Sequence, residues 1–171
     1  LLKFAPCFQP GIRKIGTVYT PSEVNSVIYK DNLDEAARKN GLTLIAAPAS
    51  TAIEVMEAAK SLVLKRIDAF CQISDNLTGS AGISIIKVSR DNRIPYYAFV
   101  SGQVKQGAMA ACARDYQQAG YEAGEMAVDV LEGADPGHIP FQVVSKTNFF
   151  VNRNNADYFK IPIPASIKTR F

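Results

Sequence analysis

The sequence has little of the chemistry that disulfide frameworks and metal centres require. It contains three cysteines, Cys7, Cys71 and Cys112, and one histidine, His138. Three cysteines are too few, and odd in number, for a disulfide framework. The apolar runs around Cys71 and Cys112 favour small buried side chains instead. No cysteine pair has metal-ligand spacing, and His138 stands alone in a loop of glycine and proline, so the sequence predicts no metal site.

Further absences narrow the classes of function. No apolar run reaches the length of about 18 residues that a membrane span needs. The net charge is +3 and the lysines and arginines are dispersed, which argues against a nucleic-acid partner. Neither a G-x-G-x-x-G fingerprint nor a Walker loop is present, and Ser74 has no histidine to activate it. We therefore predict no enzyme and no cofactor.

The remaining composition is typical of a soluble domain. Of all residues, 47% are hydrophobic and 20% are charged, and a chain of 171 residues is long enough to bury a sizeable core. The chain begins Leu1-Leu2-Lys3, without an initiator methionine or a cleavable apolar leader. We therefore expect either a mature chain or a fragment of a longer one.

The segment Lys14–Gly41 has the pattern of a strand, a polar turn and a helix. Residues 15–19 form an apolar run as dense as that of a strand covered on both faces. Apolar residues then recur at helical spacing up to Ala37, and Gly41 supplies a helix stop. The hydroxyl, amide and free N–H groups of the turn 20–26 thus stand where a buried strand ends. Ligands bind at that position in open α/β sheets.

The same unit repeats along the chain. Strands are predicted at residues 43–47, 67–73 and 94–99. Helices are predicted between them, at residues 51–63 and 83–88. The first of these helices opens with the capping-box pair Thr51 and Glu54. The fold class is therefore α/β, with a parallel sheet and crossover helices. Right-handed crossovers would place the turns 20–26 and 74–80 on one carboxyl edge of that sheet.

The regular alternation of strands and helices in the sequence ends after the fourth strand. Residues 107–113 are small and apolar and predict a fifth strand, and a long helix is expected from about residue 114 to Gly133. Small and apolar side chains on one side of this helix would let another element approach closely. An extended connection at 139–144 and a helical turn beginning near 151–156 follow. A chain that leaves its sheet for one helix and returns along an extended segment is typical of a two-lobed protein.

Four local patterns together resemble one known family. They are the turn Tyr-x-Pro-Ser-Glu-x-Asn-Ser at 19–26, the Asp-Asn helix start at 75–76, the Val-Lys-x-Gly-Ala segment at 104–108, expected as a strand, and the Asp-Tyr helix start at 115–116. From about Leu1 to Pro164, the chain is similar to the ABC-transporter substrate-binding proteins that include tryptophan- and phenylalanine-type amino-acid receptors.

The resemblance implies a type I periplasmic-binding fold, in which two α/β lobes joined by three crossovers close on a small ligand. The chain would supply the second lobe plus one helix of the first lobe. Residues 1–13 would form the end of a first-lobe helix and a crossover, and residues 14–114 the second α/β lobe. Residues 115–138 would form a helix of the first lobe. Residues 139–171 would form the return crossover and the C-terminal segment of the second lobe. The chain would then be a fragment, with the rest of the first lobe in a longer protein.

The resemblance also implies a function. The expected protein is the extracytoplasmic solute-binding component of an ABC importer, periplasmic or extracellular, lipid-anchored or soluble, with an ABC permease as its partner. The expected ligand is an amino acid, with aromatic ones favoured, while other small amino acids, a nucleobase or a sugar stay open. The alternative is a ligand-sensing domain of a regulatory or signalling protein with the same fold.

Candidate ligand-binding residues stand in the two polar turns. Ser22, Asn25 and Ser26 would donate to a carboxylate, because the start of a helix favours an anion. Asp75 and Asn76 would accept from an ammonium, so that the pair of turns would bind a zwitterion. The alternative is ordinary helix capping, in which serine, aspartate and asparagine are common.

Three further positions are weaker candidates. Glu23 also suits the positive end of the helix that follows it. The resemblance places Ser101 at the lobe edge, where many relatives carry acidic or hydroxyl residues. Residues 99–102 include no carboxylate, so Asp75 would carry more of the recognition of an amino group. Asp115 would begin the first-lobe helix and line the hinge, with helix capping as the alternative.

The helix at 116–132 carries the stripe of small and apolar side chains. In the implied fold, the first lobe covers this stripe. Without that lobe the stripe is exposed apolar surface, which would favour a homodimer through this helix.

Overall fold

A computed structural model describes residues 8–164 of the chain. The chain forms two compact units, which we describe separately. The first contains residues 8–112 and 150–164, and the second contains residues 113–149. Most of the segment 1–13, expected as the end of a first-lobe helix and a crossover, lies outside the described residues.

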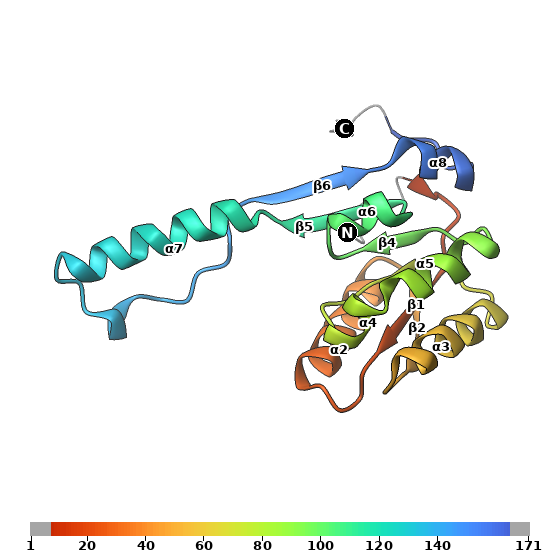
Figure 1. The fold of residues 1–171 in the computed structure, drawn as a ribbon, viewed down its shortest axis with the longest axis horizontal. Coiled ribbons are helices and arrows are strands. Elements are labelled where there is room, and N and C mark those ends of the chain that lie inside the picture. Colours follow the sequence, from red (N-terminus) through yellow and green to blue (C-terminus); the bar gives the residue numbers. More distant parts are fainter. Residues whose placement is uncertain (1–7, 165–171) are drawn as a thin grey trace. The chain divides into compact units, whose positions relative to one another are not determined.

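The strands form one six-stranded sheet in the order β2-β1-β3-β4-β5-β6 (Figure 1). They are β1 (Lys14–Tyr19), β2 (Thr43–Pro48), β3 (Ala69–Cys71), β4 (Tyr96–Ala98), β5 (Ala110–Arg114) and β6 (Thr147–Val151). β1 is parallel to both β2 and β3, with Ile15 opposite Leu44 on one side and Ala69 on the other. β4 is parallel to β3 and to β5. The predicted α/β fold with a parallel sheet is confirmed.

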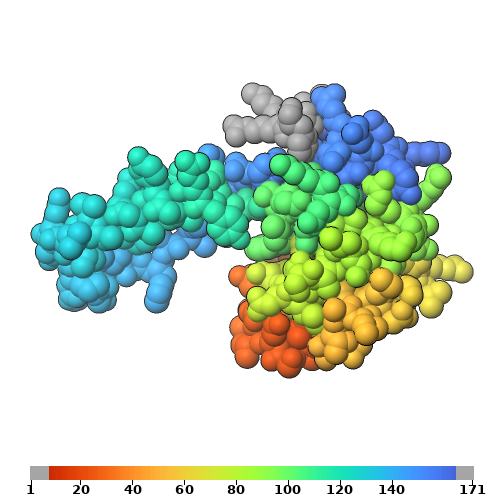
Figure 2. All heavy atoms as spheres, viewed as in Figure 1, coloured from red at the N-terminus to blue at the C-terminus, as the bar shows by residue number. Residues whose placement is uncertain are grey.

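Helices lie between the parallel strands β1 to β5 and in the segments that follow β5 and β6. They are α2 (Val24–Lys39), α3 (Ala52–Leu64), α4 (Asn76–Ser80), α5 (Gly82–Asp91), α6 (Gly102–Gln106), α7 (Tyr116–Leu131), the 3₁₀ turn η1 (Pro136–His138) and α8 (Arg153–Phe159). α3 and α5 contact each other (Figures 1 and 2). Because β2 and β3 flank β1 on opposite sides, right-handed crossovers place α2 on the face opposite α3 and α5.

The predicted helix ends form for the expected reasons. The side chain of Thr51 accepts a hydrogen bond from the Glu54 N–H at 3.3 Å. The Glu54 carboxylate accepts from the Ser50 N–H at 2.7 Å, one residue earlier than the predicted capping box would have it. At the end of α2, Gly41 takes the left-handed backbone conformation with φ of 69°.

The hydrophobic core lies between the sheet and its helices. Its buried members come from strands and helices alike and include Val18, Val55, Leu62, Phe70, Ile85 and Tyr96. Cys71 is buried in β3, and burial raises the pKa of its thiol to about 12. The prediction of a small buried side chain is therefore confirmed for Cys71, while Cys112 is only partly buried. Cys7 lies outside the described residues.

The prediction around the fifth strand was wrong in its boundaries. Residues 104–108 do not form a strand, because residues 102–106 are helix α6. Gly107 ends that helix with φ of 127°, a backbone conformation that strands do not use. β5 begins only at Ala110. Val104 is buried although it lies in a helix, so its apolar side chain alone did not distinguish a helix from a strand at this position.

The return segment also differs from its prediction in part. The extended connection continues into β6, which the sequence did not identify as a strand. The terminal helical turn is confirmed as α8, where the Asn152 side chain accepts from the Asn155 N–H at 3.2 Å. β3 is shorter than predicted, and the turn at 74–80 contains the short helix α4.

Gly107→Ala should lower the free energy of unfolding by about 2 to 4 kcal/mol, because it adds backbone strain and overpacks the core. A Cβ at Gly107 would lie 2.9 Å from Cγ2 of Ile86, in a backbone conformation with φ of 127°. Gly102→Ala is the matched control, since a Cβ there would meet no atom within 4 Å and the φ of Gly102 is not positive. Denaturant unfolding of both variants measures the effect, and equal midpoints would contradict it.

Candidate functional site

The neighbouring strands β1 and β3 end in the two polar turns identified in the sequence. β2, the next strand along the chain, lies on one side of β1, whereas β3, β4 and β5 lie on the other. The strand order therefore reverses between β1 and β3. In open α/β sheets, ligands bind outside the carboxyl ends of the strands at such a reversal.

Several hydrogen bonds join the two turns across some fifty residues of sequence. The Thr20 N–H donates to Oδ2 of Asp75 at 3.0 Å. Nδ2 of Asn25 donates to the Ser74 carbonyl at 3.3 Å. A third bond, of 3.0 Å, runs from the Asn76 side-chain amide to a Glu23 carboxylate oxygen. The prediction that the turns share one carboxyl edge is confirmed.

Asp75 is the buried centre of this arrangement. Its side chain is 6% exposed, and its carboxylate accepts from the N–H groups of Thr20 and Thr78, the latter at 2.6 Å. Burial alone would raise the pKa of Asp75. Hydrogen bonds from Ser26, Thr78 and Thr20 outweigh that effect and hold the pKa below its ordinary value. Asp75 thus caps α4 and fixes the end of β1 at the same time.

Glu23 crosses from one turn to the other. It occupies the N-cap position of α2, but its side chain makes no capping hydrogen bond to its own helix. Oε2 instead accepts from Asn76, at 3.3 Å from the backbone N–H and 3.0 Å from the side-chain amide. Nδ2 of Asn25 lies 3.4 Å from the same oxygen. Glu23 is partly exposed, so these amides orient a carboxylate at the edge of the sheet.

The three predicted serines occupy different environments. Ser26 is fully buried, and its hydroxyl accepts from the Thr20 N–H at 2.8 Å. Ser22 is exposed at the surface of its turn. Ser101 is partly buried before α6, at the carboxyl end of β4, one strand beyond β3. Ser22 is therefore accessible to a ligand, whereas Ser26 shapes the turn from inside.

The sequence analysis did not single out two threonines of the same edge. Thr20 and Thr78 are 4% and 1% exposed, and within residues 8–164 neither side-chain oxygen has a hydrogen-bond partner. Gln72 was also missed, and its side-chain carbonyl accepts from the Phe99 N–H at 2.9 Å, which joins the ends of β3 and β4. A polar residue inside or directly after a buried strand is the signal that identifies such positions.

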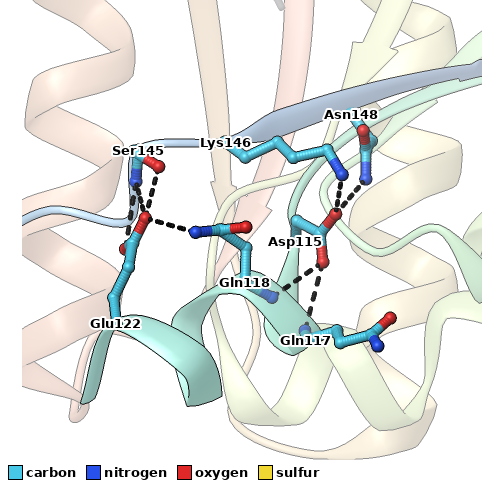
Figure 3. Close-up of polar contacts among 7 residues, drawn as sticks. All are labelled: Asp115, Gln117, Gln118, Glu122, Ser145, Lys146 and Asn148. Carbon is cyan, nitrogen blue, oxygen red and sulfur yellow. Dashed lines mark hydrogen bonds and ion pairs between the residues drawn. The ribbon is translucent and has the colours of Figure 1, made fainter. Parts of the chain in front are cut away.

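Asp115 belongs to the second unit, where it caps α7 (Figure 3). Its carboxylate accepts from the N–H groups of Gln117 and Gln118, both at 3.1 Å. Nζ of Lys146 lies 2.9 Å away and the Asn148 amide 3.0 Å away. Lys146, Gln118 and Asn148 hold the pKa of Asp115 far below its ordinary value. The capping alternative is thus observed, and a ligand role for Asp115 stays a prediction.

A second carboxylate ties α7 to the return segment within the same unit. Glu122 accepts from the backbone N–H and the hydroxyl of Ser145, and the Gln118 amide donates to it at 3.1 Å (Figure 3). The Ser145 hydrogen bond lowers the pKa of Glu122. Asp115 and Glu122 together hold the first two turns of α7 beside residues 145–148.

The described residues offer no sign of a membrane span or a metal centre. None of the helices in this part of the chain is both long and apolar enough to cross a bilayer. Within the same residues, no three histidine, cysteine, aspartate or glutamate side chains gather as metal ligands would.

Known proteins share both the sequence and the fold. Residues 5–170 match the profile of the family described as "ABC transporter substrate binding protein". A curated tyrosine-binding protein of Clostridioides difficile (strain R20291) is 40% identical over 153 residues, which are 90% of this chain and 44% of that protein.

Two solved structures extend the likeness. The ABC domain of Streptococcus pneumoniae in complex with L-Trp gives a TM-score of 0.82 at 26% identity, covering 96% of this chain and 57% of that chain. The ligand-free, open structure of a substrate-binding protein with adhesive properties from Clostridium difficile gives a TM-score of 0.80 at 33% identity. The match covers 99% of this chain and 59% of that chain. The chain therefore spans about half the length of the relatives it matches.

Proposed function

Because the chain belongs to the family of ABC transporter substrate-binding proteins, as its sequence patterns predicted, we propose that it is part of the solute-binding component of an ABC importer. Its role is to bind a small ligand outside the cytoplasm and to deliver it to an ABC permease. The family model, the tyrosine-binding relative and the ligand-free open structure described above are all of substrate-binding proteins, which agrees with a binding function.

One observation supports the position of the binding site best. Two polar turns are joined by hydrogen bonds at the point where the strand order reverses, and Ser22, Asn25 and Asn76 are exposed there. A ligand at this edge would meet polar groups that are already fixed in place, so that little ordering is needed on binding.

The proposed ligand is an amino acid, with aromatic ones favoured. Support comes from the tyrosine-binding relative and from the relative in complex with L-Trp. A thermal-shift screen of the full-length protein against the amino acids tests this proposal, because a ligand that binds only the folded state raises the melting temperature by mass action. No shift with any amino acid would contradict it.

We further propose that residues 14–114 form the second lobe of a type I periplasmic-binding fold and that residues 115–138 complete the first lobe. The relatives are about twice the length of this chain, which leaves room for the remainder of a first lobe. In this assignment the ligand is enclosed when the two lobes close, and Asp115 lies near the hinge.

Asn25→Ala in the full-length protein should weaken amino-acid binding by about 1 to 3 kcal/mol, the scale of leaving a buried polar partner unpaired. Asn25 is suited to this test because it is exposed and its amide also holds the Ser74 carbonyl. Asn40→Ala, at the other end of α2, is the control, since within the described part of the chain the Asn40 side-chain amide donates to the Ala36 carbonyl of its own helix. Calorimetry measures both affinities, and an unchanged value for Asn25→Ala would remove this residue from the site.

A further inference from the structure

The two turns carry carboxylates but no basic side chain. Residues 20–26 read Thr-Pro-Ser-Glu-Val-Asn-Ser, and residues 74–80 read Ser-Asp-Asn-Leu-Thr-Gly-Ser. Among the described residues, no ion pair joins Glu23 or Asp75 to a lysine, arginine or histidine. Lys30, one turn further along α2, is paired with Asp31 at 2.6 Å and lies over the Tyr19 ring. The edge therefore holds negative charge without a cationic partner.

Two of the three donors expected for a ligand carboxylate, Asn25 and Ser26, are already used inside the protein, and only the exposed Ser22 hydroxyl is without a partner among residues 8–164. The Asn25 amide is directed at Glu23 and at the Ser74 carbonyl. Asn76 directs its backbone N–H and its side-chain amide at Glu23. Ser26 is fully buried, and its hydroxyl accepts from the Thr20 N–H and donates to the Asp75 carboxylate. A ligand carboxylate at this edge would have to displace Glu23 and would then lie beside an unpaired like charge, which is unfavourable.

One acceptor, the partly exposed Glu23 carboxylate, is in contrast available. The amides of Asn25 and Asn76 hold Oε2 of Glu23, and no hydrogen bond to its Oε1 is present within residues 8–164. Beneath the surface, the hydroxyl groups of Thr20 and Thr78 have no hydrogen bond of good geometry within the same residues and lie beside the Asp75 carboxylate, which accepts both backbone N–H groups. An orphaned buried polar group is costly and marks a place where a partner is missing.

We propose that this edge binds the positively charged pole of its ligand, a primary ammonium, and that Glu23 is the specificity-determining carboxylate that accepts from it. Asp75 is too buried to reach the ligand and adds its negative charge from beneath. The ligand carboxylate is then bound by residues outside the two turns. This inference rests on the proposed binding function and assigns the orientation of the ligand within that site.

Small ions test the preference directly, without knowledge of the natural ligand. Isotope-labelled full-length protein is titrated with methylammonium chloride and, at equal ionic strength, with sodium acetate. We expect methylammonium to shift the Asn76 amide signal in a saturable way, and acetate to have no such effect. Glu23→Gln should weaken the methylammonium response about tenfold or more, the scale of removing a charged hydrogen-bond partner. Saturable binding of acetate, no response to methylammonium, or an unchanged response in Glu23→Gln would each overturn the proposal.

A second measurement uses L-tyrosine and 3-(4-hydroxyphenyl)propanoate, which keeps the ring and the carboxylate but lacks the ammonium. Glu23→Gln should lower the affinity for L-tyrosine about tenfold or more and leave that for the analogue unchanged. Glu35→Gln is the control, because Glu35 lies on α2, the helix that Glu23 precedes, and within residues 8–164 its ion pair is with Lys39, at 2.6 Å. Equal losses for both compounds would count against the ammonium contact. If no amino acid binds, the proposed function fails, and the methylammonium titration still decides the charge preference.

Discussion

Asp75→Ala is expected to lower the free energy of unfolding by about 2 to 4 kcal/mol, because two buried N–H groups lose a charged acceptor that contributes about 1.5 to 3 kcal/mol, and only one of them, that of Thr20, keeps a second acceptor in the Ser26 hydroxyl. These groups are the N–H of Thr20, at the end of β1, and that of Thr78, inside α4. Urea unfolding measures the loss. Asp91→Ala is the surface control, since Asp91 pairs only with Lys87 in an exposed ion pair and should change stability by less than about 1 kcal/mol.

The stabilisation by Asp75 should depend on pH in a defined direction. The pKa of Asp75 is lower in the folded protein than its ordinary value, so the folded state favours the ionised form. Its contribution is fully present above the unfolded pKa of about 3.9 and is lost as the pH falls through the lower, folded pKa. The difference in stability between wild type and Asp75→Ala should therefore be constant near neutral pH and shrink in acid.

Asp75→Ala also separates two roles for this carboxylate. The sequence suggested a direct contact with the ligand, whereas the geometry gives Asp75 two backbone partners and 6% exposure. Lower stability together with weaker ligand binding would indicate that Asp75 positions the turns. Full stability with weaker binding would indicate a ligand contact and contradict the expected loss.

The parallel part of the fold could be predicted because the residue patterns that mark its strands, helix starts and helix ends are local in the sequence. The apolar run of β1, the glycine that ends α2 and the Thr51 cap of α3 each depend on residues within one turn or one strand. α6 was missed for a physical reason. Five residues are too few to show helical periodicity, and only the backbone conformation of Gly107 separates this helix from the strand that follows. β6 follows a long irregular segment, and its pattern of two adjacent phenylalanines does not alternate.

The position of the candidate site was predictable, but the roles of its residues were not. Two polar turns after buried strands are visible in the sequence, and parallel topology brings them to one edge. Which atoms meet depends on partners about fifty positions apart, such as Glu23 with Asn76 and Thr20 with Asp75. Sequence spacing does not report whether a carboxylate is buried, as in Asp75, or held at the surface, as in Glu23.

α7 presents exposed apolar side chains within the second unit. The helix has no buried residue, and Tyr121 and Leu131 are 71% and 86% exposed. A Cβ added at Gly120 or Gly124 would meet no atom within 4 Å, so a partner could approach the helix backbone closely. A shallow groove follows this face and includes Val128. Contiguous apolar surface of this kind favours burial against another element, at about 25 cal/mol per Å².

This chain, purified as residues 1–171 alone, is expected to associate through α7 as a homodimer or to exchange the helix between two copies. In the proposed two-lobe protein, the first lobe would cover the same face, and the dimer would be unnecessary. Leu131→Glu should weaken the dimer about tenfold or more, because a buried charge without a partner opposes association. Leu64→Glu on α3 is the matched control, since Leu64 is 83% exposed in the first unit and should leave the dimer intact. Light scattering over a range of concentrations measures both variants. A wild-type chain that stays monomeric while its α7 amides resist hydrogen exchange would show that this face needs no partner.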